Sequence, residues 1–264
     1  MKKSVLFFDI DGTLISDITN QIPESTIHAM RQAKKNGHLL FVNTGRTLCS
    51  LRRELNQIEF EGFLCGCGTY LTYRDEVLFQ SSIEQKRGRE IIDKMLSCRM
   101  EGVMEGTQDN YLPRKRSRFS LLEEQRKYFD KYLGVGRNQY IEDGDFVYDK
   151  MFVYGDEQSD QDTFFDFISC DLDVVVRGEN MYEIIQKGYS KATACAYMLD
   201  RLGMSREDMY VFGDSTNDLE MFQCALHTVA MGDHARELEP YTEFVTKRVE
   251  EDGIAHALKH YGFI

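Results

Sequence analysis

Two aspartates close the first apolar segment of the chain. Asp9 and Asp11 follow the run Val5–Phe8 in the stretch FFDIDGT. A run that is apolar on both faces is typical of a strand buried in a parallel sheet. Because strand residues two apart point to the same side of the pleat, we expect the two carboxylates to converge where the chain leaves the core. A Mg²⁺ ion would relieve their repulsion, since it binds carboxylate and carbonyl oxygens.

Polar residues also follow two other predicted strands. The segment HLLFVNTGR ends in Thr44 and Gly45, a hydroxyl and an accessible backbone N–H that suit a phosphoryl oxygen. The segment MYVFGDSTND ends in Asp214, with Asn217 and Asp218 opening the next helix. Ligands of open parallel sheets bind at the carboxyl ends of the strands. We therefore expect these side chains to gather beside the first aspartate pair.

Each of these segments also has a purely structural interpretation. Asp and Gly often close strands, TGR is an ordinary loop sequence, and GDSTND contains common helix-capping residues. Lys191, just before a predicted helix, would on its own be a solvated surface lysine. Their joint occurrence at strand ends, in this order, favours a common site.

Strand and helix patterns alternate over the first eighty residues. Pro23 suits the start of a helix that Gly37 would end, and a second helix is expected in LCSLRRELNQI. The segment GFLCGCG follows as a strand, and YLTYRDEVLFQ has the pattern of a hairpin that turns at Arg74. This order predicts right-handed crossovers and an α/β fold with a doubly wound, Rossmann-like parallel sheet.

The end of the chain repeats this pattern. SKATACAYMLDRLG reads as a helix closed by Gly203, and DGIAHALKHYG as a helix capped by Asp252. Between the two halves the alternation is less regular, which indicates an inserted α+β cap domain over residues 84–187. Residues 1–83 and 188–264 would then form the core domain.

The amino-acid composition indicates which partners are disfavoured and in which cellular compartment the protein is expected. The net charge is -12, from 32 basic and 44 acidic residues, which opposes attraction to nucleic acid and to anionic membranes. No segment reaches the apolar length of a membrane span, and Asp9 interrupts the only candidate for a signal peptide. Seven scattered cysteines suit reduced thiols, so a cytoplasmic protein is expected. Cys65 and Cys67 are expected on one face of a buried strand, although a metal site is an alternative.

Four motifs together resemble a known family. DIDGT, NTGR, a YSK lysine and GDSTND are similar, in sequence order, to the four motifs of the haloacid dehalogenase (HAD) superfamily of phosphatases. The segments VAMGDHARELEP and VEEDGIAHAL resemble the closing segments of its Cof-type branch, which carries a type IIB cap between the second and third motifs. The resemblance covers about residues 4–80 and 187–260, and in the insert it rests on position and length only.

The resemblance implies a role for each matching residue. Asp9 would attack phosphorus and become an aspartyl phosphate, and Asp11 would protonate the departing alcohol and then deprotonate water. Mg²⁺ would be held by the Asp9 carboxylate, the Asp11 backbone carbonyl and Asp214, with Asp218 supporting the site from behind. The phosphoryl oxygens would be held by Thr44, Gly45, Lys191, Asn217 and the backbone N–H of Ile10.

Three features compete with this assignment or depart from it, and the role of a fourth, a basic run, is open. Lys187 is a rival for the basic role, but Lys191 opens the predicted helix and matches the spacing of the family. The stretch MFVYGDEQSD superficially resembles MYVFGDSTND, yet it lies in the insert, so Asp156 is expected to be a loop acid. Cys67 stands where the family usually has Asn, which affects the expected contact between core and cap. The basic run Arg114–Arg118 could bind a second anionic group or be solvated.

The combined interpretation is a Mg²⁺-dependent phosphatase that acts on a small phosphorylated metabolite, with a sugar phosphate as the expected class. A phosphomutase would use the same chemistry and return the phosphoryl group to substrate. A signalling module with a phosphorylated aspartate is the alternative from another class, but such modules are about half this length and lack the insertion. The sequence predicts neither the identity of the substrate nor the oligomeric state.

Overall fold

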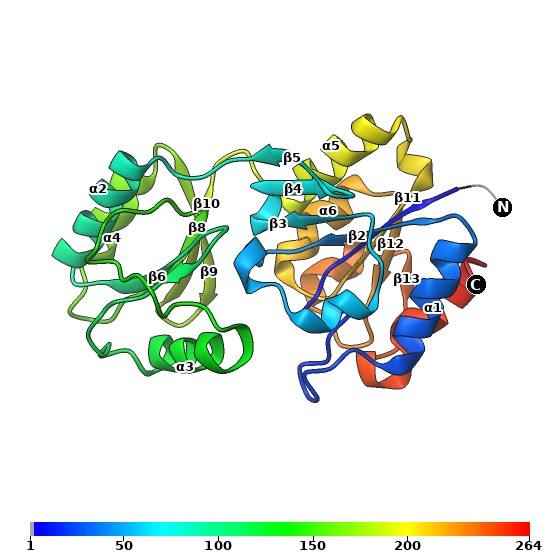
Figure 1. Ribbon diagram of the computed structural model, residues 1–264, viewed down its shortest axis with the longest axis horizontal. Helices are drawn as coiled ribbons and strands as arrows, with labels where there is room; N and C mark the ends of the chain where they lie inside the picture. Colours follow the sequence, from blue (N-terminus) through cyan, green and yellow to red (C-terminus); the bar gives the residue numbers. More distant parts are fainter. Residues whose placement is uncertain (1–2) are drawn as a thin grey trace. The chain divides into compact units, whose positions relative to one another are not determined.

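The computed structural model describes residues 3–264 and divides them into two compact units. The first contains the described residues up to Gly45 together with Arg53–Phe79 and Tyr189–Ile264. The second contains Arg46–Arg52 and Gln80–Gly188. Each unit has its own sheet, one mainly parallel and the other antiparallel (Figure 1). The α/β class predicted from the sequence, with a doubly wound core sheet and a separate cap sheet, is confirmed.

The sheet of the first unit has eight strands in the order β13-β12-β11-β1-β2-β3-β4-β5. Neighbours from β13 to β3 run parallel, and β3 and β4 are antiparallel. The central strand β1 carries the DIDGT motif at its carboxyl end, so both flanking strands can contribute to one site. The strands are β1 (Val5–Phe8), β2 (Leu39–Asn43), β3 (Gly62–Cys65), β4 (Tyr70–Tyr73), β5 (Glu76–Gln80), β11 (Met209–Gly213), β12 (His227–Ala230) and β13 (Phe244–Val245).

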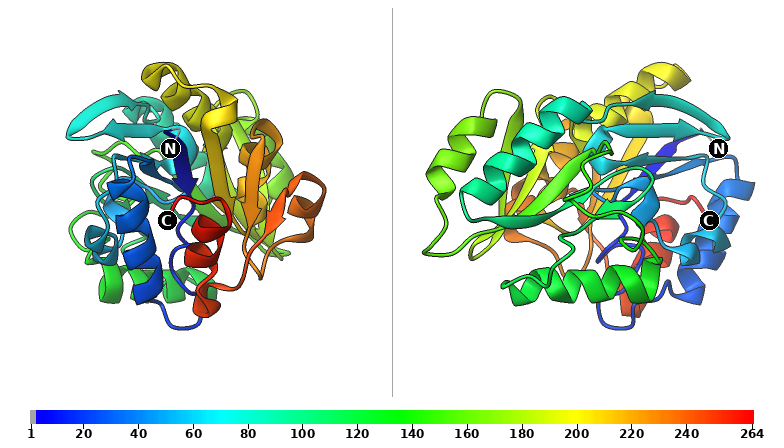
Figure 2. Two further views of the ribbon diagram at one scale, coloured as in Figure 1. Left: turned by 90° about the vertical axis from the view of Figure 1, so that its right-hand side faces the viewer. Right: turned by 60° about the vertical axis from the view of Figure 1, so that its left-hand side comes forward.

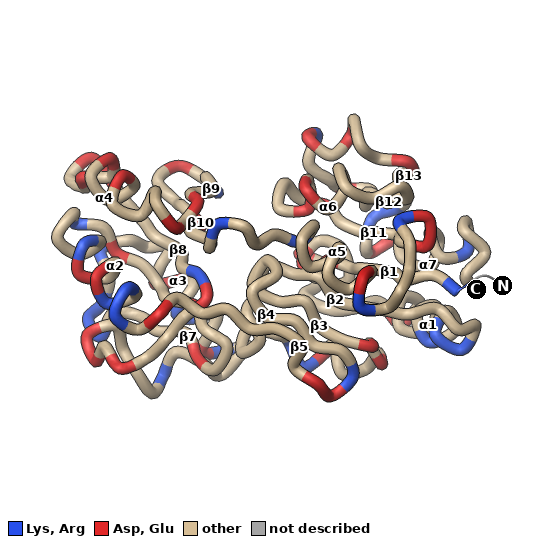
Figure 3. Tube along the Cα trace, turned by 90° about the horizontal axis from the view of Figure 1, so that it is seen from above, with Lys and Arg blue, Asp and Glu red and all other residues tan. Residues whose placement is uncertain are grey.

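Helices cover both faces of this sheet. The α5 and α6 helices pack on the face that carries Phe7 and Phe41. The α1 and α7 helices lie side by side, as Figure 2 shows. Figure 3 shows basic residues in blue along α1, and Lys34 and Lys35 lie in its last turn, where positive charge is favourable to the helix dipole. The helices are α1 (Glu24–Lys35), α5 (Lys191–Leu202), α6 (Leu219–Cys224) and α7 (Gly253–His260).

The second unit has a five-stranded sheet in the order β7-β6-β8-β10-β9, in which all the recorded pairs are antiparallel. Its apolar core contains Ile91 and Met95 of α2 together with Phe164 and Ile168 of α4. A smaller cluster buries Leu122 of α3. The elements are α2 (Gln85–Ser97), β6 (Glu101–Glu105), β7 (Asn110–Tyr111), α3 (Ser120–Tyr128), β8 (Lys150–Tyr154), α4 (Gln161–Ile168), β9 (Leu172–Gly178) and β10 (Met181–Gln186).

Short turns of tighter or wider helix complete the structure. A π-helical turn, η4 (Phe129–Leu133), extends α3. No helix in the described part of the chain has the length and apolarity that crossing a membrane requires. The 3₁₀ turns are η1 (Leu48–Ser50), η2 (Arg53–Gln57), η3 (Gly66–Gly68), η5 (Arg206–Asp208), η6 (Thr216–Asp218), η7 (Arg236–Tyr241) and η8 (Val249–Glu251).

The helix expected in LCSLRRELNQI is wrong. The segment forms the two separate 3₁₀ turns η1 and η2, and Leu51 between them is extended, with φ −69° and ψ 137°. The Ser50 carbonyl accepts a hydrogen bond from the Arg46 guanidinium at 3.0 Å. An extended residue cannot continue the i to i−4 ladder, so a continuous α-helix does not form.

The expected placement of two cysteines on one strand face is also wrong. The β3 strand ends at Cys65, and Cys67 lies in the η3 turn with φ 55°. Both side chains are buried free thiols. The chain turns at this point instead of continuing the pleat, so the two side chains do not share a face of the sheet.

The predicted cap of the last helix is correct in position and wrong in mechanism. Asp252 precedes α7, but its backbone is left-handed, with φ 63°, and its side chain makes no capping bond to the helix. Its Oδ1 instead accepts a hydrogen bond from the Ser25 hydroxyl at 2.5 Å. The carboxylate therefore joins the start of α1 to the start of α7.

Candidate active site

The DIDGT segment leaves the sheet immediately after Asp9. The Asp9 amide donates to the Phe212 carbonyl at 3.0 Å, which extends the pairing with β11 by one residue. The amides of the residues that follow turn back onto the Ile10 carbonyl, and Gly12 has φ +75°. Asp11 therefore belongs to this turn and not to the strand, so the alternation of strand residues does not explain its position. The turn holds Asp11 half-buried.

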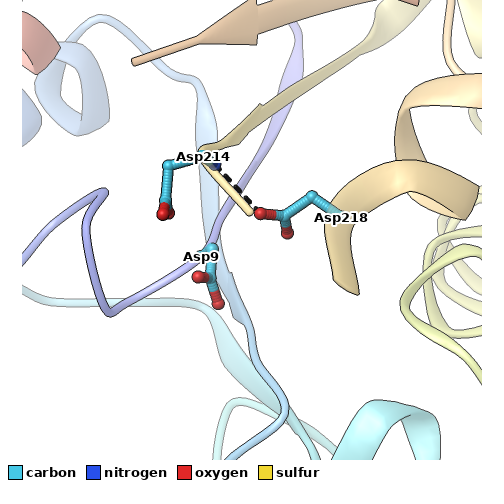
Figure 4. Close-up of side chains that lie close together, drawn as sticks. All are labelled: Asp9, Asp214 and Asp218. Carbon is cyan, nitrogen blue, oxygen red and sulfur yellow. Dashed lines mark hydrogen bonds between the residues drawn. The ribbon is translucent and has the colours of Figure 1, made fainter. Parts of the chain in front are cut away.

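Three carboxylates meet at the carboxyl ends of β1 and β11. Asp9, Asp214 and Asp218 each offer an oxygen within 4.8 Å of the others, and Figure 4 shows them converging. Asp9 and Asp218 are buried, with 3% and 0% exposure. Hard oxygen ligands of this kind suit Mg²⁺ or a similar cation. The cluster could therefore hold a metal ion.

Glycines leave the room that these carboxylates occupy. A Cβ atom at Gly12 would lie 2.4 Å from Oδ2 of Asp214, closer than a real contact allows. A Cβ atom at Gly213 would lie 2.5 Å from Cγ of Asp218. At both positions the space next to the backbone is filled by a carboxylate, so the backbone itself is shaped to accept the acidic cluster.

Asp218 is fixed by several hydrogen bonds. Its Oδ2 accepts from the backbone amides of Asp214 and Ser215 at 3.0 and 3.1 Å, and the first of these is dashed in Figure 4. Its Oδ1 accepts from Lys191 at 2.7 Å. The hydroxyl of Thr13 donates to Oδ1 of Asp214 at 2.8 Å. Because both oxygens of Asp218 already accept from the protein, this residue is better suited to support a metal site than to bind the metal directly.

Lys191 supplies a buried positive charge at this cluster. Its Nζ lies 2.6 Å from Oδ1 of Asp9 and 2.7 Å from Oδ1 of Asp218, and its side chain has 0% exposure. It is the first residue of α5, whose capping box is formed by Ser190 and Thr193. The side chain of Asn43 donates to the Lys191 carbonyl at 2.9 Å, which ties the start of α5 to the end of β2.

Burial and neighbouring charges raise the pKa values of Asp9, Asp214 and Lys191. Burial raises the pKa of Asp9 to about 7, against the opposing attraction of Lys191. Burial raises the pKa of Asp214 to about 8, and the charges of Asp9 and Asp218 add to this effect. Burial acts to lower the pKa of Lys191, but the attraction of Asp218 and Asp9 outweighs it and the pKa is raised. One lysine does not neutralise three carboxylates, so the cluster favours a further cation.

The predicted phosphate-binding residues occupy the same edge of the sheet. The register of β1 with β2 pairs Phe8 with Val42, so Ile10 and Thr44 follow neighbouring strand ends. Thr44 is buried, and its amide is already used in a hydrogen bond to the Leu64 carbonyl at 2.8 Å. The Thr44 hydroxyl and the Gly45 backbone are the groups of this loop that the sequence predicts as phosphate ligands.

Asn217 is oriented by two donors. Its Oδ1 accepts from the Ser215 hydroxyl at 2.7 Å and from Lys191 at 3.2 Å. The amide group must therefore present its Nδ2 hydrogens elsewhere, and within the described residues they have no protein partner. Asn217 is consequently a donor available for an oxygen ligand beside Lys191.

Comparisons with known proteins agree with this geometry. A family model described as haloacid dehalogenase-like hydrolase matches residues 6–258. The chain belongs to the haloacid dehalogenase-like hydrolases. The putative phosphatase YkrA of Bacillus subtilis (strain 168) is 28% identical over 273 residues, and the alignment covers 100% of both chains.

Two further relatives place the chain within this family. The 5-amino-6-(5-phospho-D-ribitylamino)uracil phosphatase YitU of B. subtilis (strain 168) is 25% identical, with 98% of each chain covered. The structure of the HAD subclass IIB sugar phosphatase BT4131 superimposes with a TM-score of 0.81 at 26% identity and covers 99% of this chain and 100% of that one. The protein is thus a HAD-like phosphatase of the Cof-type branch, a phosphoric monoester hydrolase of small phosphorylated metabolites with a cap domain.

The rival residues considered for this HAD site lie in the other unit. Lys187 donates to the Ser169 carbonyl at 2.6 Å and is exposed. Asp156 accepts from the amide of Gln158 and from Arg118, each at 3.0 Å, as expected of a loop acid. In the basic run, Arg114 pairs with Asp143 and Arg118 with Asp156, so both terminal arginines already have acidic partners.

Three residues of the HAD site were not predicted from the sequence. Asn43 anchors α5, Ser215 orients Asn217, and the Thr13 hydroxyl donates to Asp214. A buried Asn at the end of an apolar strand is the one local signal that could have indicated Asn43, because a buried amide must find a partner. The other two contacts join segments about two hundred residues apart or depend on the turn geometry.

Proposed function

We propose that this protein is a Mg²⁺-dependent sugar phosphate phosphatase that works through an aspartyl phosphate on Asp9. The observation that carries the proposal is the contact of 2.6 Å between Nζ of Lys191 and Oδ1 of Asp9 in a buried site. An ammonium group held there favours the ionised, nucleophilic form of the carboxylate and opposes the rise in pKa that burial causes. It also offsets the repulsion between that carboxylate and a phosphate dianion.

In the first step a carboxylate oxygen of Asp9 would form a bond to phosphorus as the bond between phosphorus and the alcohol oxygen breaks. Asp11 would donate its proton to the departing alcohol. Asp11 lies half-buried in the turn directly after β1, two residues after Asp9 in the sequence, and this position supports the role. The products of the step are the alcohol and the aspartyl phosphate.

In the second step Asp11, now ionised, would take a proton from water as that water attacks phosphorus. The bond between phosphorus and the Asp9 oxygen breaks, which releases inorganic phosphate and restores the carboxylate. Asp11 regains the proton that it donated in the first step. The cycle therefore needs no co-reactant besides water.

The phosphoryl oxygens would be held by donors from three strand ends. The hydroxyl of Thr44, the backbone of Gly45 and the N–H of Ile10 come from the turns after β1 and β2. Asn217, whose Oδ1 is already occupied, would donate through Nδ2 beside Lys191. Donors fixed before the substrate arrives lower the barrier because they need no reorganisation during the reaction.

A Mg²⁺ ion would be held by the Asp9 carboxylate, the Asp11 backbone carbonyl and Asp214, with Asp218 behind them. When bound it would supply positive charge next to the phosphoryl oxygens. The fit rests on the oxygen donors of the cluster and on the space that Gly12 leaves beside Asp214.

The names of two relatives support a sugar phosphate as the substrate class. BT4131 is a sugar phosphatase, and YitU acts on a compound whose phosphate is carried by a ribityl chain. Both names describe a phosphate on a hydroxylated carbon chain. A sugar phosphate shares that chemistry, and a cap unit of about a hundred residues is large enough to cover such a ligand.

The test is phosphate release from p-nitrophenyl phosphate and from a panel of sugar and sugar alcohol phosphates, with Mg²⁺ or with EDTA. Asp9→Asn is expected to abolish release, and Asp156→Asn, the loop acid, is expected to leave it unchanged. Activity that persists in EDTA would contradict the metal requirement. A panel in which no hydroxylated phosphate is hydrolysed faster than p-nitrophenyl phosphate would contradict the substrate class.

A further inference from the structure

The second unit contains a cavity of about 310 Å³ that the proposed reaction does not use. All the residues that line it belong to this unit. Its apolar wall includes Tyr111 and Phe146, whose rings are stacked with centroids 3.7 Å apart, and Val147, which is 46% exposed. This volume is at the lower end of the range for small-molecule sites. The cavity therefore has the size and the aromatic wall of a site for a small ligand.

Several polar groups on the wall have no partner in the protein. Within the described residues, the side chains of Gln108 and Gln139 and the hydroxyl of Tyr111 make no hydrogen bond to another protein group. Each amide carries two donors and an acceptor oxygen, and the phenol can donate and accept. These groups can bond to a ligand without breaking a bond within the protein.

Two hydroxyls on the wall are oriented as acceptors. Ser82 donates to Oδ1 of the buried Asp149 at 2.6 Å, and Thr107 donates to its Oδ2 at 2.8 Å. A hydroxyl has one hydrogen, so both oxygens have only lone pairs left, and the Thr107 oxygen also accepts from the Gln80 amide at 3.5 Å. Asp145, which accepts from Gln85 at 2.6 Å, adds a carboxylate to the wall. The wall is consequently rich in acceptors that suit the hydroxyl donors of a ligand.

The charge of the lining argues against an anion. Among the described residues, no lysine or arginine lines the cavity, and Asp145 gives it a negative charge. A phosphate group would find no cation here, in contrast to the site around Lys191. The cavity is thus matched to a ligand without phosphate.

We propose that this cavity binds a neutral, hydroxyl-rich molecule of the size of a monosaccharide or sugar alcohol. The amides of Gln108 and Gln139 donate to and accept from its hydroxyls, and Ser82 and Thr107 accept from them. The aromatic wall covers its carbon skeleton. The site is independent of the phosphoryl chemistry and does not require the nucleophile Asp9.

The test is isothermal titration of the full chain with D-glucose, ribitol and myo-inositol, and with Tris as a cationic competitor. At least one of the three neutral compounds is expected to bind with a millimolar Kd, and Asp9→Asn is expected to bind it equally well. The double variant Gln108→Ala with Gln139→Ala should weaken binding about tenfold, since two hydrogen bonds are lost. Both side chains lie at the cavity wall and pair with nothing, so the fold should tolerate the change.

Gln158→Ala is the matched control, because Gln158 is an exposed glutamine of the same unit outside the cavity. It should bind the neutral compound as the native chain does. Absence of binding by all three compounds, tighter binding of Tris, or unchanged affinity in the double variant would overturn the proposal. Equal weakening by Gln158→Ala would also overturn it, since the effect would not come from the cavity.

Discussion

The chemistry of this protein centres on one buried lysine among three carboxylates. Lys191 contacts Asp9 and Asp218, and its charge is part of the reason that these acids can be buried side by side. Removal of one member of a buried ion pair leaves an uncompensated charge, which costs more than the pair itself contributes. The residue therefore affects both stability and activity.

Lys191→Met removes this charge and keeps most of the volume of the side chain. We expect the free energy of unfolding to fall by about 3 kcal/mol, and kcat to fall at least a hundredfold because the anionic transition state loses a donor. Urea unfolding and phosphate release measure the two effects. Lys187→Met, at an exposed position, should change neither. A variant of Lys191 with kcat within tenfold of the native value would contradict its placement in the site.

Gly12 and Gly37 form a matched pair for testing the space beside Asp214. Both have positive φ, +75° and +97°, but a Cβ at Gly12 meets Asp214 at 2.4 Å, whereas a Cβ at Gly37 meets nothing within 4 Å. Each Gly→Ala change should lower stability by about 1 kcal/mol through backbone strain, and Gly12→Ala should lower it further because Asp214 must shift.

Only Gly12→Ala is expected to raise the Mg²⁺ concentration needed for half-maximal activity, by tenfold or more. The measurement is phosphate release as a function of Mg²⁺ for both variants and the native chain. Equal Mg²⁺ requirements in the two variants would show that Gly12 does not shape the metal site.

At the scale of elements, the sequence was most informative where local signals determine structure. The closing of α5 by Gly203, with φ 62°, and the polar residues at the ends of β1, β2 and β11 were predicted because capping and burial depend on neighbouring residues. The confirmed family and fold class rest on these segments. The roles of the individual site residues stay predictions.

What the sequence did not reveal depends on specific polar contacts and on packing, some within one segment and some between distant segments. The Arg46 guanidinium donates a hydrogen bond to the Ser50 carbonyl, and the segment after Arg46 forms 3₁₀ turns. The apolar spacing of that segment does not indicate either feature. The link from Asn43 to Lys191 joins residues 148 positions apart. The cavity in the second unit could not be predicted either, because the residues that line it come from four separate stretches of chain and meet only through packing.

The α2 helix is joined to the start of β9 by an ion pair whose pH dependence can be predicted. Arg87 donates to both carboxylate oxygens of Asp171, at 2.8 and 2.9 Å. These hydrogen bonds lower the pKa of Asp171 below its ordinary value. A carboxyl with a lowered folded pKa stabilises the fold above its unfolded pKa, and this contribution is lost as the pH falls through the folded pKa.

Arg87→Met should therefore be less stable than the native chain at neutral pH, and the difference should shrink as the pH falls below about 4. Urea unfolding over this pH range measures the difference, and a carbon NMR titration of Asp171 should show its pKa rising in the variant. Lys86→Met, on the same helix and exposed, is the control. A stability difference that grows on acidification would contradict the assignment.

At the scale of the whole molecule, the net charge of -12 makes local neutralisation essential for an anionic substrate. The acidic cluster also links metal binding to folding, because a cation that binds only the native state stabilises it. Thermal unfolding is therefore expected at a higher Tm in Mg²⁺ than in EDTA. The increase should be smaller in Asp214→Asn, and it should persist in Asp156→Asn. Equal Tm values in Mg²⁺ and EDTA for the native chain would contradict a folded-state metal site.

In the proposed mechanism Asp9 carries the phosphoryl group during turnover. The most direct test is to quench the native enzyme in acid during turnover of p-nitrophenyl phosphate, reduce it with borohydride and map the peptides by mass spectrometry. An acyl phosphate is reduced to an alcohol, so the account predicts homoserine at position 9 that depends on substrate. Homoserine at Asp11, Asp214 or Asp218, or unmodified Asp9 in an enzyme that turns over, would contradict the account.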